Sequence, residues 1–510
     1  MRADSALPPL QTSLNAGTPE LSDPDAIVAL RDLLRSVDYS VESIRTALAT
    51  EGPFMRDPLE LPFYLKVLPE NETLSTIIKL FRLGVPVDVD EAAAALAPLE
   101  PERLEKVGLF VRDGGSVVSS VSIAPSGELL LASDWEQEDE APHRQDQVLG
   151  ISAPTRVLAN LTVRQHVDSA LDIGTGCGVQ ALLAARHTRA VTAIDINPRA
   201  VEFGQFNVLL NGSPNVEFRQ GDLFEPVDGE TFDLIVCNPP YVISPETDYA
   251  FRDSGLPGDS FCEGLVRRLP EFLNEDGFAH VLVSWVHGPG DWETPLRAWV
   301  EGSGCDAILF HYVTHEPVAY AAGWGRLLGR DPEVFGAAVE RWSEYYERLG
   351  IEAIAWGAVI LRRREGENWI WAHSPATERI SPGGEQVLRL FQAQDFLVAV
   401  ESEQDFLNQP FSLAEDHRLE QTARLGSGSR EVERTVLKLD GGLGFRVAVD
   451  AASLEVLARL DGERSLASVF AEVATEAPGA PTAEEFAAAA VPALTRLIEL
   501  GLVVPVVRAG

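Results

Sequence analysis

The fold of this chain is decided by residues 167–195, VDSALDIGTGCGVQALLAARHTRAVTAID. The runs Ser169–Ile173 and Ala190–Asp195 are short and mostly apolar, which is typical of buried strands. Between them lie a glycine-rich turn, Gly174–Gly178, and a stretch with the pattern of a helix, Val179–Arg186. Such a unit forms a parallel pair of strands, and its turn brings bare backbone close to a ligand at the carboxyl end of the sheet. The stretch therefore predicts an α/β fold with a nucleotide-type binding site.

The spacing of the glycines indicates which ligand this site binds. A dinucleotide fingerprint has the pattern G-x-G-x-x-G, whereas Val179 occupies the position of the third glycine here. The segment from Asp172 to Gly178, with glycines at every second position from Gly174, resembles instead the S-adenosylmethionine (SAM) site of class I methyltransferases. The resemblance implies that the cofactor is contacted by Asp172, Gly174, Thr175, Gly176, Cys177 and Gly178, and also by Asn238 further along the chain. A turn that serves only tight packing remains the alternative.

Two further acids extend the resemblance to the SAM site. It implies that Asp195, at the end of the second strand, binds both ribose hydroxyls. After a third predicted strand, Val216–Gln220, it implies that Asp222 accepts a hydrogen bond from the adenine amino group and that Leu223 offers its backbone beside the ring. The alternatives are that Asp195 only caps the helix beginning near Asn197, and that Asp222 only starts a turn.

A second decisive segment is the run Phe232–Cys237 followed by Asn238, Pro239, Pro240 and Tyr241. The apolar run predicts a central strand, which ends at the prolines because they cannot donate to a ladder. Asn238 then lies at the same sheet edge as the glycine turn. The tetrapeptide resembles the motif of methyltransferases that act on planar nitrogens. These include the glutamine N5-methyltransferases of release factors (HemK-type), the adenine N6-methyltransferases and some guanine N2-methyltransferases.

The tetrapeptide suits a planar nitrogen for chemical reasons. An amide or exocyclic nitrogen delocalises its lone pair, so it must be held and polarised before it attacks a methyl group. The carboxamide oxygen of Asn238 can accept one N–H, the carbonyl of Pro239 can accept another, and Tyr241 can stack on the flat group. Positioning contributes as much as roughly 7–11 kcal/mol in well-oriented intramolecular reactions. The predicted catalytic residues are therefore Asn238, Pro239, Pro240 and Tyr241; the alternative is a proline loop in which Asn and Tyr occur by chance.

The net charge of −37 restricts the class of substrate. Chains that bind nucleic acid usually show a basic footprint, so this charge favours a protein or small-molecule substrate. The one compact basic patch, Arg362–Arg364, favours RNA instead. The chain has no apolar run of about 18 residues and no signal-peptide pattern, so we expect a cytoplasmic protein that does not contact a membrane.

The four cysteines are Cys177, Cys237, Cys262 and Cys305. They are far apart and form no C-x-x-C pair, which predicts neither a disulfide framework nor a zinc site. We predict no metal in this protein. Cys177 and Cys237 fall within the proposed cofactor site, where we expect small packing residues rather than nucleophiles.

Composition and pattern divide the chain into four parts. Residues 1–25 are rich in Pro, Ser and Ala and predict a disordered tail. Residues 26–138 combine helical patterns with a β-hairpin and predict a winged-helix-like domain, and residues 139–375 form the methyltransferase domain. Residues 376–510, with a linker at 426–429, loosely resemble a second winged-helix-like module. The predicted architecture is a Rossmann-like class I methyltransferase core with an α+β winged-helix-like domain at each end.

An aromatic-rich helical segment, Pro317–Gly350, is inserted near the end of the methyltransferase domain. Its aromatic residues include Trp324, Trp342, Tyr345 and Tyr346. The segment falls where substrate loops tend to be. It therefore either selects the substrate or forms an extra packed hairpin.

These observations favour a SAM-dependent N-methyltransferase of a protein glutamine side chain, of the release-factor type. The resemblance to HemK-type enzymes extends from about Leu171 to Trp285 and includes a turn centred on Gly277. The runner-up is an rRNA or DNA adenine-N6 or guanine-N2 methyltransferase. A third hypothesis is a non-catalytic scaffold, against which the intact set of site residues argues. The flanking domains are expected to bind protein or peptide.

Overall fold

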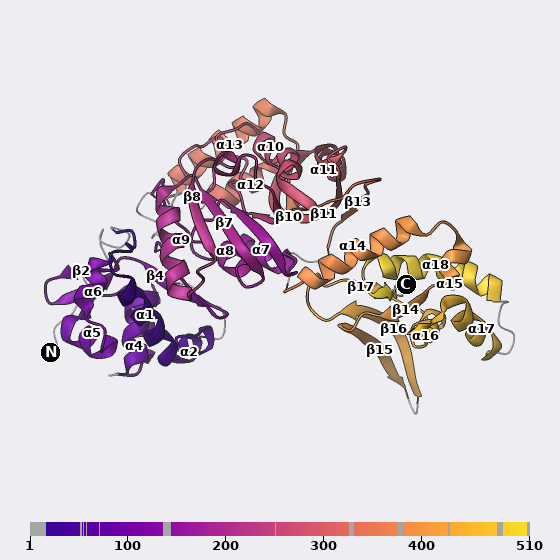
Figure 1. Ribbon diagram of the computed structural model, residues 1–510, viewed down its shortest axis with the longest axis horizontal. Coiled ribbons are helices and arrows are strands. Elements are labelled where there is room, and N and C mark those ends of the chain that lie inside the picture. Colours follow the sequence, from indigo (N-terminus) through magenta and orange to yellow (C-terminus); the bar gives the residue numbers. More distant parts are fainter. Residues whose placement is uncertain are drawn as a thin grey trace. The chain divides into compact units, whose positions relative to one another are not determined.

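The computed structural model divides the chain into two units (Figure 1). The first unit consists of Met1–Arg156, His166–Cys305 and Thr314–Glu365, and the second of Val157–Gln165, Asp306–Val313 and Gly366–Gly510. The residues that the structure describes are 17–50, 54, 56–57, 59–70, 72–135, 144–249, 251–325, 331–375, 381–426, 429–476 and 483–506.

Six strands of the first unit are neighbours in the sheet that carries the site. They are β6 (Val167–Ile173), β7 (Thr188–Asp195), β8 (Val216–Gln220), β9 (Phe232–Cys237), β10 (Leu273–His287) and β12 (Ala353–Arg363). Their order is β12-β10-β9-β6-β7-β8. All neighbours run parallel except β12, which is antiparallel to β10. The central strands are apolar over most of their buried length because a parallel sheet is covered on both faces.

The strand order reverses beside β6. Strand β7 follows β6 in the chain and lies on one side of it, whereas β9 lies on the other side. The loops that leave the carboxyl ends of β6 and β9 therefore flank a crevice, which is where ligands bind in open α/β sheets. The prediction of a parallel pair around the glycine turn is confirmed.

The helices that cover this sheet begin and end at recognisable residues. They include α8 (Val179–Ala184), α9 (Pro198–Asn211), α10 (Ser260–Arg268) and α11 (Glu293–Val300), whereas α7 (Ala153–Leu161) precedes β6 in the chain. Helix α9 begins as predicted, because the side chain of Asn197 accepts a hydrogen bond from the N–H of Arg199 at 3.0 Å. It ends at Gly212, whose φ of 70° is the left-handed conformation that glycine adopts without strain.

The N-terminal part of the first unit combines short helices with two small sheets. The helices are α1 (Pro24–Ser36), α2 (Val41–Ala47), α3 (Leu61–Val67), α4 (Thr73–Ile78), η1 (Lys79–Leu83), α5 (Val89–Leu96) and α6 (Pro101–Lys106). Three strands form a sheet in the order β1-β3-β2, and two form the hairpin β4-β5: β1 (Val87–Asp88), β2 (Phe110–Asp113), β3 (Ser116–Ser119), β4 (Ser122–Ser126) and β5 (Leu129–Ser133). The winged-helix assignment stays a prediction.

This N-terminal part shares a hydrophobic core with helix α9. The buried side chains of Phe203, Phe206 and Leu210 on α9 belong to the same cluster as Leu30 on α1 and Leu131 on β5. The burial of large apolar side chains is the main favourable term in packing of this kind. The expected boundary between residues 138 and 139 lies outside the described residues.

Polar contacts complete the junction between the N-terminal part and α9. The guanidinium of Arg199 pairs with the carboxylate of Asp134 at 2.7 Å, and both side chains are buried. The side-chain amide of Asn207 donates to the carbonyl of Ala132 at 2.9 Å and accepts from its N–H at 2.8 Å. The buried polar groups of this junction are thus paired with one another.

Residues 17–25 differ from the expected disordered tail. Helix α1 begins at Pro24, and the N-cap Asp23 pairs with Arg103 at 2.7 Å. The composition is that of a tail, but a partner far along the chain holds the segment in place. Residues 1–16, the rest of the predicted tail, lie outside the described residues.

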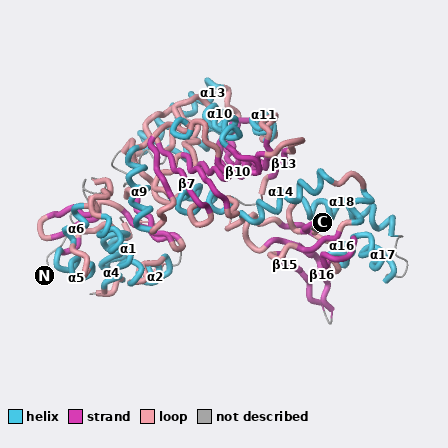
Figure 2. The backbone as a smooth tube through the Cα atoms, in the orientation of Figure 1, coloured by secondary structure: helices cyan, strands magenta, loops and turns pink. Residues whose placement is uncertain are grey.

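The second unit contains three strand arrangements. Its helices and strands are α14 (Gly384–Ala399), α15 (Glu403–Asn408), α16 (Ala451–Leu457), α17 (Leu466–Glu476), α18 (Ala483–Glu499), β13 (Ile370–His373), β14 (Pro410–Leu413), β15 (His417–Gly426), β16 (Ser429–Leu439), β17 (Arg446–Ala448), β18 (Asp461–Ser465) and β19 (Val503–Pro505). Strand β13 pairs in parallel with β11 (Cys305–His315). The other sheets have the orders β18-β14-β19 and β15-β16-β17. Figure 2 labels β15 and β16 of the latter sheet.

The prediction of a linker at residues 426–429 is wrong for Gly426 and Ser429, the two residues of this segment that the structure describes. Gly426 pairs with Ser429 across the antiparallel strands β15 and β16, so these two residues belong to a sheet. Composition alone did not show this, because Gly and Ser are typical of linkers.

Two features are absent among the described residues. None of the helices there combines the length and the apolar composition that crossing a membrane requires. No group of three or more His, Cys, Asp or Glu side chains there could hold a metal ion.

Candidate active site

The glycine turn and the segment that begins at Asn238 meet at one edge of the sheet. Ile173 at the end of β6 and Cys237 at the end of β9 are register partners, so the two strands end at the same level. A Cβ atom built on Gly174 would lie 3.9 Å from the backbone oxygen of Asn238. Between the two segments lies a cavity of about 590 Å³, a volume typical of a small-molecule site.

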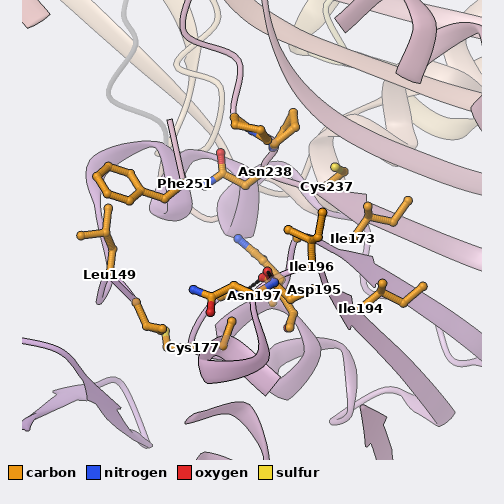
Figure 3. A pocket seen from close by; sticks show the side chains of 18 of the residues that line it. Leu149, Ile173, Cys177, Ile194, Asp195, Ile196, Asn197, Cys237, Asn238 and Phe251 are labelled. Atoms are coloured by element: carbon orange, nitrogen blue, oxygen red, sulfur yellow. Dashed lines mark hydrogen bonds between the residues drawn. The ribbon is translucent and has the colours of Figure 1, made fainter. Parts of the chain in front are cut away.

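The cavity has two sides (Figure 3). Cys177, Asp195 and Asn197 lie on one side, and Asn238 and Phe251 lie on the other. Ten of the predicted site residues line the cavity: Gly174, Thr175, Gly176, Cys177, Asp195, Asp222, Leu223, Asn238, Pro239 and Pro240. The structure thus brings together residues from the ends of β6, β7, β8 and β9.

Gly176 presents bare backbone to the cavity. Its φ of 55° is left-handed, and a Cβ atom there would meet nothing within 4 Å. Glycine is therefore needed for the backbone conformation and for close approach of a ligand rather than for internal packing. The N–H of Gly176 donates to Oδ2 of Asp195 at 2.8 Å.

The carboxylate of Asp195 is held at the cavity wall by backbone donors. Besides Gly176, the N–H of Asn197 donates to its Oδ1 at 2.9 Å. Burial raises the pKa of Asp195, and the hydrogen bonds from Asn197 and Gly176 oppose this shift. Each carboxylate oxygen still has a free lone pair, so Asp195 can accept from hydroxyl groups of a ligand.

Asp172 lies behind the turn and does not line the cavity. Its Oδ2 accepts from the hydroxyl of Thr175 at 2.7 Å and from the N–H of Ala181 at 2.9 Å. Burial raises the pKa of Asp172 to about 7. Asp172 therefore supports the turn and the start of α8 rather than contacting a ligand directly.

Gly178 also lies outside the cavity wall. A Cβ atom on this residue would lie 3.3 Å from the Cα of Gly204 and 3.5 Å from the ring of Phe218. Its φ of 84° is left-handed as well. Gly178 thus allows α8 and α9 to pack closely, and its expected contact with the cofactor is replaced by this packing role.

Tyr241 points away from the cavity. Its side chain is buried, its ring centroid lies 6.4 Å from that of Trp356, and burial raises the pKa of its hydroxyl. The N–H of Tyr241 donates to the carbonyl of Pro239 at 2.8 Å. The structure therefore gives Tyr241 a packing role in place of the expected stacking role.

Asn238 carries the clearest chemical signal in the cavity. Its Oδ1 atom is buried and has no hydrogen-bond partner among the described residues. Buried acceptors in folded proteins are nearly always paired, so an acceptor left over in a cavity wall fits a donor brought by a ligand. An amide N–H is such a donor.

Several wall residues carried no recognisable motif. They include Gln147, Leu149 and Ser152 before the turn, and Phe251, Asp253, Ser254, Leu256 and Phe261 after the Asn-Pro-Pro-Tyr segment. Val148 and Thr155, which precede β6 in the chain, also lie in the wall. The residues after Tyr241 show no motif whose spacing could have assigned them to the site from sequence.

None of the four cysteines forms a disulfide, and all four are buried. Cys177 and Cys237 line the cavity. Burial raises the pKa of the Cys177 thiol to about 12 and raises that of Cys237 well above its usual value. Both are therefore neutral thiols at physiological pH, and the expected packing role fits them.

This sheet, with a glycine turn and an Asn-Pro-Pro segment at its reversal point, defines a class I SAM-dependent methyltransferase. Residues 150–254 match the family model of the methyltransferase small domain. Residues 37–120 and 388–505 match two models described as domains of unknown function.

Sequence relatives indicate which kind of methyltransferase this chain is. A putative protein N5-glutamine methyltransferase of Methanocaldococcus jannaschii is 34% identical over 140 residues, which cover 26% of this chain and 69% of the relative. The release factor glutamine methyltransferase of Geobacter sulfurreducens is 33% identical over 250 residues, which cover 46% of this chain and 81% of the relative. The chain belongs to this HemK-type family of SAM-dependent N-methyltransferases, and the predicted enzyme class and cofactor are confirmed.

Two further matches complete the comparison. The ribosomal protein uL3 glutamine methyltransferase of Bradyrhizobium diazoefficiens is 38% identical over 125 residues, 22% of this chain and 39% of the relative. Among solved structures, the YcgJ protein of Bacillus subtilis matches with a TM-score of 0.28 and 17% identity, over 41% of this chain and 97% of that one.

Proposed function

We propose that this enzyme methylates the side-chain amide nitrogen of a glutamine in a protein, with a release factor as the first candidate substrate. The observation that carries the proposal is the unpaired, buried Oδ1 of Asn238 in the cavity wall opposite the glycine turn. The names of the relatives and the net charge of −37 support a protein substrate.

The residues of the cavity divide into a cofactor side and an acceptor side. When bound, SAM supplies a methyl group activated by its positively charged sulfur. The bare backbone of the glycine turn and the carboxylate of Asp195 would hold its amino-acid and ribose parts, and Asp222 and Leu223 would flank its adenine. All of these residues line the cavity.

On the acceptor side, Asn238 accepts an N–H of the substrate amide through Oδ1. This hydrogen bond orients the amide and increases the electron density on its nitrogen. The carbonyl of Pro239 already accepts the N–H of Tyr241, and its second lone pair can take the other amide proton. The expected rate gain comes from positioning the nitrogen toward the methyl group.

The nucleic-acid alternative loses its main support. Arg362, the first residue of the predicted basic patch, is buried, and Arg363 donates to the carbonyl of Pro270. The patch is thus not a freely exposed cluster that could neutralise phosphates. Binding of protein or peptide by the flanking parts of the chain, and a cytoplasmic location, stay predictions.

The test is transfer of labelled methyl groups from SAM to defined acceptors. Purified release factor, ribosomal protein uL3 and ribosomal RNA are each incubated with the enzyme, and mass spectrometry locates the added methyl group. We expect one methyl group on a glutamine of the release factor. Label in RNA and in neither protein would contradict the proposal.

A further inference from the structure

We propose that the helical insertion α12 (Pro317–Gly325) and α13 (Pro332–Leu349) positions the methyl acceptor, and that it does so by presenting Phe251 to the acceptor's planar group. This inference rests on the proposed function. It assigns a stacking residue and an element that positions this residue, neither of which follows from the Asn-Pro-Pro-Tyr motif.

The insertion contacts the loop that forms the acceptor wall, of which the structure describes residues 242–249 and 251–258. Phe251, Asp253, Ser254 and Leu256 of this loop line the cavity. The loop begins directly after Tyr241, so its course decides which side chains face the substrate amide. Within the loop, Val242 and Asp253 form an isolated β-bridge, and the insertion adds contacts outside this bridge.

Three tyrosines of the insertion hold both ends of this loop. Near its start, the hydroxyl of Tyr346 donates to the carbonyl of Ile243 at 2.8 Å, and the hydroxyl of Tyr320 accepts from the N–H of Ile243 at 3.3 Å. Near its end, the hydroxyl of Tyr345 accepts from the N–H of Gly258 at 2.9 Å. The insertion therefore supplies hydrogen-bond partners to the backbone of Ile243 and Gly258, near the two ends of the loop.

Glu246 joins the loop to α13 by its side chain. Its Oε1 accepts from Nε1 of Trp342 and from Nε of Arg341, both at 3.0 Å. The carboxylate is only 15% exposed, so these charge-assisted hydrogen bonds are partly shielded from water.

A stack of side chains leads from α13 to the cavity. The guanidinium of Arg252 lies 5.5 Å from the ring of Trp342 and 4.7 Å from the ring of Tyr249. Arg252 is itself fixed by two hydrogen bonds to Asp253, at 2.7 and 2.9 Å, and both of these side chains are buried. Tyr249 in turn stacks on Phe251, with 5.6 Å between ring centroids and 27° between ring planes.

Phe251 takes the position that the motif alone would have assigned to Tyr241. Tyr241 is buried outside the cavity wall, whereas Phe251 lies in that wall on the same side as Asn238 (Figure 3). An aromatic face next to a carboxamide can pack against a planar amide that the carboxamide holds by hydrogen bonding. Asn238 thus orients the acceptor nitrogen, and Phe251 restricts its plane.

The first test compares Phe251→Leu with the conservative variant Phe251→Tyr. We measure KM and kcat for methylation of purified release factor, and SAM affinity by calorimetry. Phe251→Leu should raise KM for the release factor roughly three- to tenfold while SAM affinity stays within about twofold. Phe251→Tyr keeps the aromatic face and should restore most of the affinity. An unchanged KM in Phe251→Leu would overturn the role of Phe251.

The second test examines the insertion without relying on an acceptor. Hydrogen exchange of the amides in residues 242–258 is compared between Glu246→Ala and the matched control Glu344→Ala, a change on the exposed face of α13. Glu246→Ala should speed exchange by roughly tenfold, and the control should not. Equal exchange in both variants would overturn the positioning role.

The two tests separate this inference from the proposed function. If the wild type methylates none of the release factor, uL3 and ribosomal RNA, the proposed function fails. If the wild type methylates the release factor but Phe251→Leu matches it in KM, only the inference fails.

Discussion

The N–H of Gly176 donates to Oδ2 of Asp195 at 2.8 Å, so the glycine turn after β6 and the acid at the end of β7 form one rigid element. The turn exposes backbone to the cavity, and the acid exposes its remaining lone pairs there. A ligand that binds both therefore meets groups whose positions are already fixed relative to each other.

Asp195→Ala should weaken SAM binding by roughly ten- to hundredfold, because the change removes the hydrogen-bond acceptor proposed for the ribose hydroxyls and the partner of Gly176. Calorimetric titration with SAM measures the effect. Asp228→Ala, at an exposed turn residue, is the control and should bind SAM as the wild type does. Wild-type affinity in Asp195→Ala would refute the assigned role.

Asn238→Ala should retain SAM binding and lose turnover by roughly a hundredfold or more, the usual cost of removing one preorganised hydrogen-bonding group from an active site. Single-turnover methylation of the release factor, at saturating SAM, gives the rate. Because SAM affinity is measured on the same variant, a loss of cofactor binding is distinguished from a loss of chemistry. Unchanged turnover would show that Oδ1 of Asn238 does not hold the acceptor.

The buried carboxyl of Asp172 should make stability depend on pH. Its pKa is raised from 3.8 to about 7 in the folded protein. Between these values the folded state holds a proton that the unfolded state has lost, so the free energy of unfolding falls as pH rises from about 4 to about 7. Asp172→Asn cannot titrate and should lack this decline, which is at most about 4 kcal/mol.

Urea unfolding at pH 5 and pH 8, followed by tryptophan fluorescence, tests this dependence on Asp172. The difference in unfolding free energy should shift in favour of Asp172→Asn as pH rises. A parallel response of the two proteins would mean that Asp172 is ionised throughout this range.

Gly204→Ala should destabilise the protein by roughly 1–3 kcal/mol, because the new Cβ would lie 2.1 Å from the ring of Phe218 and force a shift. The matched control is Gly264→Ala in α10, where a Cβ atom would meet nothing within 4 Å. Alanine there should stabilise the helix by about 0.5–1 kcal/mol. The midpoints of urea unfolding should thus move in opposite directions.

Local sequence patterns were sufficient for the elements that position the site. The parallel strands β6, β7 and β9, the glycine turn and the place of Asn238 all follow from apolar runs and from residues that end strands, which act over a few neighbours. The cap and the end of α9 follow from Asn197 and Gly212 for the same reason.

The direction of individual side chains depended on distant partners. Asp172 turns toward Thr175 and Ala181 instead of the cavity, and Tyr241 is buried near Trp356, more than a hundred residues away. The loop after Tyr241 is bound at Ile243 and Gly258 by tyrosines of the helical insertion. No local sequence pattern predicts these contacts. Phe251 could not be identified from sequence because its place depends on this long-range packing.

The shared core between helix α9 and the N-terminal part bears on how the enzyme can be dissected. A fragment cut at residue 139 would leave Phe203, Phe206 and Leu210 without the apolar side chains that cover them, and would strip Arg199 of its carboxylate. Such a fragment would expose these apolar side chains of α9 to solvent. A shortened enzyme without the N-terminal part should therefore be unstable. The N-terminal part is best regarded as an integral part of the methyltransferase domain's core.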